Sequence, residues 1–104
     1  MGNQDLAYRI IRGFVEDMPG QIAALAQAVS EGDSKQVRLL AHSIKGAAAS
    51  VGGTEMRQAA WKLEQEGSSG DLAAAFADLP ELSASFERVR PVMERFCGED
   101  SAGR

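Results

Sequence analysis

The sequence predicts an all-α protein, an antiparallel up-down bundle of four helices. The composition is rich in Ala, Leu, Glu, Gln and Arg, which favour helices. No stretch alternates polar and apolar residues as a half-buried strand would, and apolar residues instead recur every three or four positions along four segments. Short breaks separate these segments, and short loops imply that neighbouring helices run antiparallel.

The first helix is expected over residues 5–30. Its apolar stripe consists of Ile10, Phe14, Met18, Ile22, Leu25 and Val29. We expect Pro19 to kink or divide this helix, because proline removes one backbone hydrogen bond. Residues 31–33 end it, and Asp33 or Ser34 can cap the helix that follows.

The second helix is expected over residues 34–51, with Gly52 and Gly53 stopping it. Its core stripe consists of Val37, Leu40, Ile44, Ala48 and Val51, widened by Ala41 and Ala47. The third helix is expected from Thr54, as its cap, to Glu66, before a loop over residues 67–70.

The last helical region is expected from Asp71 to Phe96, with interruptions or bends near Pro80 and Pro91. The chain of 104 residues is long enough for one domain and too short for two. We therefore expect a single domain over residues 1–104, folded over 5–97, with a flexible tail over 98–104.

The bulk composition narrows the function. A net charge of −4 argues against nucleic acid as a partner, because phosphate backbones select basic surfaces. The lack of any run of about 18 apolar residues argues against a membrane span or direct membrane contact. The single cysteine, Cys97, excludes an intramolecular disulfide and a multi-cysteine metal site.

The only histidine, His42, lies almost opposite the centre of the apolar stripe of the second helix. Helical spacing therefore places it toward solvent. Arg38 precedes it by one turn, Lys45 follows it by three residues, and Lys35 continues the same strip. Such a basic rim would favour a neutral, nucleophilic imidazole, and it would attract a phosphoryl group or an acidic partner.

Gly46 follows His42 by about one turn, in a helix that uses alanine freely on both sides. Glycine inside a helix costs about 1 kcal/mol relative to alanine, so a steric reason for it is expected. It could clear the approach of another molecule to the imidazole, or it could allow close packing of a neighbouring helix. An isolated helical histidine is usually a solvated surface residue, so spacing alone leaves the function open.

The stretch 41–46, Ala-His-Ser-Ile-Lys-Gly, followed by Ala-Ala-Ala-Ser-Val-Gly over 47–52, resembles the signature of histidine-containing phosphotransfer (Hpt) domains. In that family a histidine is followed by Lys-Gly at the third and fourth positions, then by small residues and a helix-ending glycine. Many members carry an amide side chain where this chain has Ser50. Weaker matches lie at residues 14–19, 56–64, 71–72 and 86.

The resemblance implies that His42 accepts a phosphoryl group on its outer ring nitrogen, that Lys45 steadies the phosphoryl charge and that Gly46 leaves room for the donor or acceptor. It implies response-regulator receiver domains and a histidine kinase as partners. The receiver would supply an acidic pocket and Mg²⁺, so the domain needs no cofactor and has no kinase activity of its own. A cytoplasmic place is implied, with any membrane tether belonging to a parent sensor kinase.

A receiver domain needs an apolar footing around the histidine. Leu39 is the clearest candidate, against the alternative of an ordinary exposed leucine, and Ala49 permits close docking. Lys35 and Arg38 complete the expected partner-binding set, and residues 13–17 of the first helix are expected nearby. Trp61 falls off the apolar stripe of its helix, and we expect it to be partly buried against a neighbouring helix rather than to bind a partner.

Two other functions fit the same motif. The chain could be a helical module that binds a receiver or kinase without transferring phosphate, although the complete set of His42, Lys45 and Gly46 argues against this. It could also be the phosphotransfer domain of a chemotaxis-type kinase. An independent enzyme is the least favoured class, because one histidine without a base, cofactor or pocket does not easily turn over a substrate. We expect a monomer.

Overall fold

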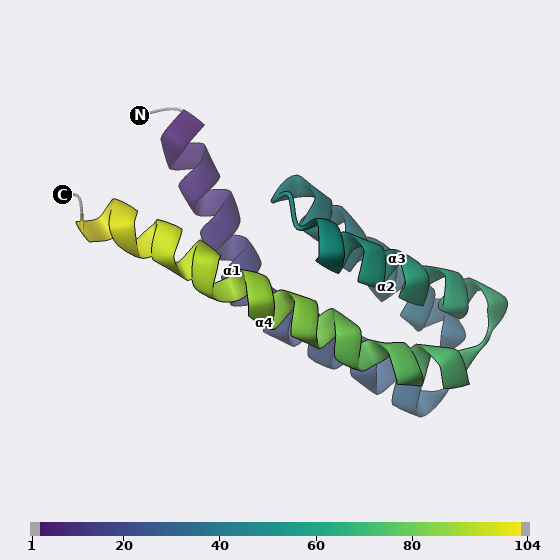
Figure 1. Ribbon diagram of the computed structural model, residues 1–104. Coiled ribbons are helices and arrows are strands. Elements are labelled where there is room, and N and C mark those ends of the chain that lie inside the picture. Colours follow the sequence, from purple (N-terminus) through teal and green to yellow (C-terminus); the bar gives the residue numbers. More distant parts are fainter. Residues whose placement is uncertain (1–2, 103–104) are drawn as a thin grey trace.

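The computed structural model describes the backbone of residues 3–102 and the side chains of residues 5–97. The described residues form four helices, α1 (Asn3–Glu31), α2 (Ser34–Ser50), α3 (Thr54–Ser69) and α4 (Leu72–Ala102). Successive helices run antiparallel, and α1 and α3 each pack against both α2 and α4 (Figure 1). The predicted all-α bundle is therefore confirmed, with α2 and α4 across the diagonal from each other.

The helices differ in length. With 29 and 31 residues, α1 and α4 are much longer than α2 and α3, which have 17 and 16. The start of α1 and the end of α4 consequently extend beyond the loop between α2 and α3 (Figure 1). Ile10, expected in the core stripe, is 43% exposed because α1 passes the end of α2 at this point.

The core lies between the four helices. Each large apolar side chain that is fully buried stabilises the fold by about 1.5–3 kcal/mol. The largest of them are Met18, Leu25, Val37, Ile44, Met56, Leu63 and Leu82. The rings of Phe14 and Phe86 meet edge to face with centroids 6.0 Å apart, which joins the two long helices.

The long helices continue through their prolines. Pro19 lies inside α1, and Pro80 and Pro91 lie inside α4, so the expected division or interruption of these helices is wrong. A proline removes one hydrogen bond of the helix ladder. Buried side chains on both sides of each proline, among them Met18 beside Pro19, hold the helix against the core despite that loss.

The helix ends follow the expected chemistry in part. The Asp33 carboxylate accepts a hydrogen bond from the Gln36 backbone amide at 3.1 Å, as predicted, and caps α2. Thr54 is not a cap, because Gly53 occupies that position without a side-chain hydrogen bond. The helix α4 runs to Ala102, past the expected end at Phe96 and into the expected tail, since one interior glycine costs only about 1 kcal/mol. Residues 103–104 of that tail lie outside the described residues.

Gly67 is a packing residue and not part of a loop. The helix α3 continues through it to Ser69 and ends at Gly70, whose φ of 79° is left-handed, so the expected loop over 67–70 is wrong. A Cβ at Gly67 would lie 2.6 Å from the backbone nitrogen of Arg38 and 3.0 Å from its Cα. The missing side chain therefore lets the backbones of α2 and α3 approach closely.

A pair of acidic side chains links α3 to α4. Burial and, next, a hydrogen bond with Asp78 raise the pKa of Glu66 to about 7. The same hydrogen bond lowers the pKa of Asp78, whose carboxylate also lies 3.4 Å from the Lys62 ammonium. Below neutral pH the Glu66 carboxyl group therefore keeps its proton, and its O–H donates a hydrogen bond to the Asp78 carboxylate.

We expect Gly67→Ala to lower the free energy of unfolding by about 1–3 kcal/mol, because the new methyl group meets backbone atoms that cannot move aside cheaply. Gly20→Ala in α1 is the matched control, since its Cβ would meet nothing within 4 Å. It should stabilise the protein by about 0.5–1 kcal/mol. Urea unfolding followed by circular dichroism compares them, and equal effects would show that Gly67 does not limit the approach of α2 and α3.

We expect Glu66→Gln to flatten the loss of stability between pH 5 and pH 8. The folded-state pKa of about 7 lies above the ordinary value of 4.5, so the folded protein holds a proton that the unfolded chain releases. The stabilising contribution is thus complete below about pH 4.5 and is lost as the pH rises through about 7. Unfolding curves across this range measure it. Glu31→Gln, at the exposed end of α1, is the control, and an equal flattening there would remove Glu66 as the cause.

Candidate functional site

The imidazole of His42 faces solvent from the middle of α2. Val37, Ala41, Ile44 and Ala48 turn one side of the helix into the core. His42, one position after Ala41, therefore points outward, and its side chain is 65% exposed. The helix around it is anchored at both ends, by the Asp33 cap and by the turn at Gly52, whose φ of 74° suits glycine.

A carboxylate of the neighbouring helix bridges two of the predicted site residues. The Oε2 atom of Glu64 in α3 lies 3.0 Å from Nδ1 of His42, and its Oε1 atom lies 2.7 Å from Nζ of Lys45. The side chain of Glu64 is largely buried between the helices, and that of Lys45 is partly buried. The sequence predicts His42 and Lys45 as neighbours on one helix, and the fold adds Glu64 between them.

The charge state of Glu64 fixes the proton on the imidazole. The hydrogen bond from Lys45 is the largest cause that lowers the pKa of Glu64, burial opposes it, and the bond to His42 adds to the lowering. An ionised carboxylate can only accept hydrogen bonds, so Nδ1 of His42 must donate. In the neutral ring the lone pair is therefore on Nε2, away from Glu64.

An acidic side chain joins the basic residues that were predicted around His42. The charged group in contact with its ring is the carboxylate of Glu64, and Lys45 is turned toward that carboxylate. The basic residues Lys35 and Arg38 remain on the same strip of α2, with Lys35 exposed and Arg38 half-buried where its backbone meets Gly67. An acidic side chain from another helix is invisible to the spacing of α2 alone.

The predicted access residue is open. A Cβ at Gly46 would meet nothing within 4 Å, so close helix packing does not explain this glycine. Leu39 is 42% exposed on the same outer side of α2, and Ala49 is also exposed. The hydroxyl of Ser50 donates to the carbonyl of Ala47 at 2.8 Å and so serves the end of its own helix.

The first helix lies on the other flank of α2. A groove of about 270 Å³ lies at the surface between α1 and α2. Its lining consists of Arg9, Ile10, Gly13, Phe14, Asp17, Met18 and Gln21 from α1 and of Ala47 and Ser50 from α2. His42 and Lys45 instead lie on the flank that faces α3, as their contacts with Glu64 show. Gly13, Phe14 and Asp17, which were expected beside His42, instead lie against the opposite flank of α2.

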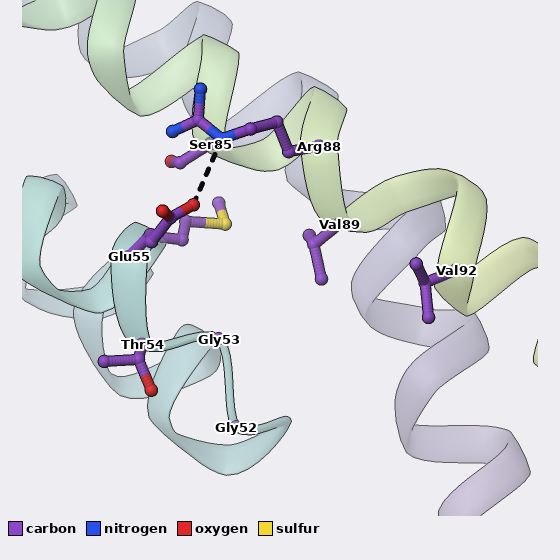
Figure 2. A pocket seen from close by; sticks show the side chains of 9 residues that line it. Gly52, Gly53, Thr54, Glu55, Ser85, Arg88, Val89 and Val92 are labelled. Atoms are coloured by element: carbon purple, nitrogen blue, oxygen red, sulfur yellow. Dashed lines mark hydrogen bonds and ion pairs between the residues drawn. The ribbon is translucent and has the colours of Figure 1, made fainter.

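A second groove, of about 300 Å³, lies between α4 and the start of α3 (Figure 2). Arg88 of α4 reaches across it to Glu55 at 3.1 Å and also contacts Glu81 at 2.7 Å. None of the predicted site residues lines it. Within the part of the chain that the structure describes, no three His, Cys, Asp or Glu side chains cluster as metal ligands. Among the described residues, none of the helices α1 to α4 could span a bilayer.

A comparison with protein families matches the Hpt domain over residues 9–91. The chain belongs to the Hpt domain family. Domains of this family carry out histidine phosphotransfer in phosphorelays, and they interact there with receiver domains. The matched range contains all of α2 and α3, and so His42, Lys45 and Glu64. Searches of curated proteins and of solved structures give no match.

Trp61 differs from expectation. It was predicted to be partly buried against a neighbouring helix, and its side chain is 53% exposed. The side of α3 that faces the core is formed by Met56, Ala60, Leu63 and Gly67, and Trp61 lies outside this set. Glu64 and Trp61 are thus the residues near the site that periodicity did not identify. Glu64 could have been found by placing α3 antiparallel to α2 across the short turn at 51–53.

Proposed function

We propose that His42 is the phosphoacceptor of this Hpt domain, taking a phosphoryl group from an aspartate of one receiver domain and passing it to an aspartate of another. The observation that supports this most directly is the contact of Nδ1 with Glu64 at 3.0 Å, since it leaves an exposed Nε2 with a lone pair. His42 is also the only histidine of the chain, so no second imidazole competes for the role.

The transfer is a substitution at phosphorus. The Nε2 lone pair attacks the phosphorus of the aspartyl phosphate, an N–P bond forms, and the P–O bond to the aspartate breaks to release its carboxylate. Nδ1 keeps its proton, and the Glu64 carboxylate stabilises the positive charge that develops on the ring. The second transfer reverses these steps with another aspartate. The receiver supplies the aspartate, and we expect it to supply Mg²⁺ as well.

Lys45 and Gly46 would serve the incoming phosphoryl group. The Lys45 ammonium carries three donors, so it can keep its contact with Glu64 while another donor reaches a phosphoryl oxygen one turn away. Gly46 is exposed and leaves the approach open on the outer side of α2. Lys35, Arg38, Leu39 and Ala49, on the sides of the same helix, would contribute to partner binding.

We expect a phosphorylated receiver domain to label the wild-type protein and not His42→Gln, because the variant lacks the nucleophilic nitrogen. The label should be acid-labile and base-stable, as a phosphoramidate is. Since His42 is exposed, the variant should stay folded, with a change in stability of about 0.5 kcal/mol or less. Label on His42→Gln would place the acceptor elsewhere, and wild-type protein that binds receivers without taking label would indicate a binding module.

We expect Gly46→Ala to make the protein more stable and less active. The helix gains about 0.5–1 kcal/mol from alanine, since the methyl group meets nothing in the fold. The same methyl group would obstruct the donor, so transfer should slow about tenfold, a barrier increase of about 1.4 kcal/mol. Gly20→Ala, equally open but on α1, should gain the stability and keep the transfer rate. Wild-type transfer by Gly46→Ala would mean that this glycine does not clear the approach.

A further inference from the structure

The exposed indole of Trp61 lies on the side of α3 that borders the phosphoacceptor. Lys62 and Glu66 turn toward Asp78 of α4, whereas Glu64 turns toward α2. Trp61 precedes Glu64 by three residues, so it lies on the Glu64 side of α3, farther out toward solvent and about 4.5 Å along the axis. It therefore borders the line along which α2 and α3 pack, where Glu64 meets His42.

The level of Trp61 relative to His42 follows from the antiparallel pairing of α2 with α3. Glu64 contacts both His42 and Lys45, so a step from Glu64 back to Trp61 runs along α2 from His42 toward Gly46. Leu39 lies one turn from His42 in the opposite direction. Leu39 and Trp61, two exposed apolar side chains from two helices, therefore lie on either side of the imidazole along the helix axes. Gly46 lies in the direction of Trp61.

The charges on this edge differ from those of the protein as a whole. The net charge is −4, yet basic residues border the edge on both helices. Lys35 and Arg38 precede His42 on α2, and Arg57 lies one turn beyond Trp61 on α3. An acidic phosphorylation pocket complements such an edge, whereas a second copy of an acidic chain does not.

We propose that Trp61 anchors the receiver domain, so that the partner docks across the α2–α3 edge with Leu39 and Trp61 on either side of His42. This rests on the proposed phosphotransfer at His42. A receiver that brings its aspartate to Nε2 covers both apolar side chains. Burying a half-exposed tryptophan beside the reacting atoms supplies binding energy of the kind that concentrates in interface anchors. Trp61 sets affinity and partner choice and takes no part in the chemistry.

The chain offers a matched control. Phe76 in α4 is even more exposed, at 71%, and α4 lies diagonally across the bundle from α2. It should therefore not touch a partner seated at His42. Phe76→Ala removes an exposed aromatic side chain of similar size without changing the proposed edge, and it controls for general effects of losing such a group.

The test is phosphotransfer measured against receiver concentration. For Trp61→Ala we expect the half-saturating receiver concentration to rise about tenfold or more, while the rate at saturation stays within about twofold of wild type. Trp61→Phe should recover much of the affinity, and Phe76→Ala should match wild type. Thermal melts show whether each variant is folded. If Trp61→Ala does not fold, the conservative variant Trp61→Phe still tests whether the indole contributes to affinity. A half-saturating concentration for Trp61→Ala equal to that of Phe76→Ala would overturn the proposal, and so would a loss of the saturating rate alone.

A second measurement separates this proposal from the first. Trp61 is the only tryptophan, so its fluorescence reports directly on docking, and in His42→Gln it reports without chemistry. Receiver binding to His42→Gln should change the emission at the concentration that half-saturates wild-type transfer. If a receiver binds and the emission does not change, the role of Trp61 is overturned even when His42 is the acceptor. If the emission changes but the wild-type protein takes no label, only the proposed phosphotransfer at His42 is overturned. Sedimentation that shows a dimer broken by Trp61→Ala would assign the edge to a second copy and overturn the proposal.

Discussion

The close approach of α2 and α3 at Gly67 is the constraint on which the site depends. With no side chain at Gly67, the α3 backbone reaches Arg38, and the antiparallel pairing is fixed at one end of the hairpin. Three residues back along α3, Glu64 then meets His42 and Lys45. A wider separation of the helices would lengthen both contacts and leave the largely buried carboxylate without partners, which is unfavourable for a charged group.

Two glycines inside helices serve opposite purposes in this domain. Gly67 is buried, and the backbone of another helix occupies the space that a side chain would fill. Gly46 is exposed, and no described residue occupies the corresponding space. Both weaken their own helices, because glycine has more freedom to lose than alanine on folding. In the first case tighter packing offsets that loss. In the second nothing within the fold offsets it, which is the pattern expected where function requires an open surface.

The site combines a rigid frame with a single ionic bridge. The buried side chains of α2 hold the helix so that His42 cannot turn inward, and the Glu64 carboxylate then orients the ring. Lys45 favours the ionised form of Glu64, and the ionised carboxylate fixes the proton on Nδ1 of His42. Lys45 therefore influences the imidazole indirectly, through Glu64. The helix α2 thus positions His42, and Glu64 of α3 fixes which of its ring nitrogens carries the proton.

The four helices, the core stripe of α2 and the outward position of His42 were predictable from the sequence, because they depend on spacing within one helix. The sequence also placed Lys45 and Gly46 beside the histidine for the same reason. It misjudged the prolines and the residues from Gly67 to Ser69, where packing against the core and against Arg38 outweighs local preference. The contact of Glu64 with His42 and the exposure of Trp61 were decided only by the tertiary structure. Both depend on how α3 is rotated and aligned against α2, and that alignment arises from side chains of two helices meeting, which no periodicity within a single helix encodes.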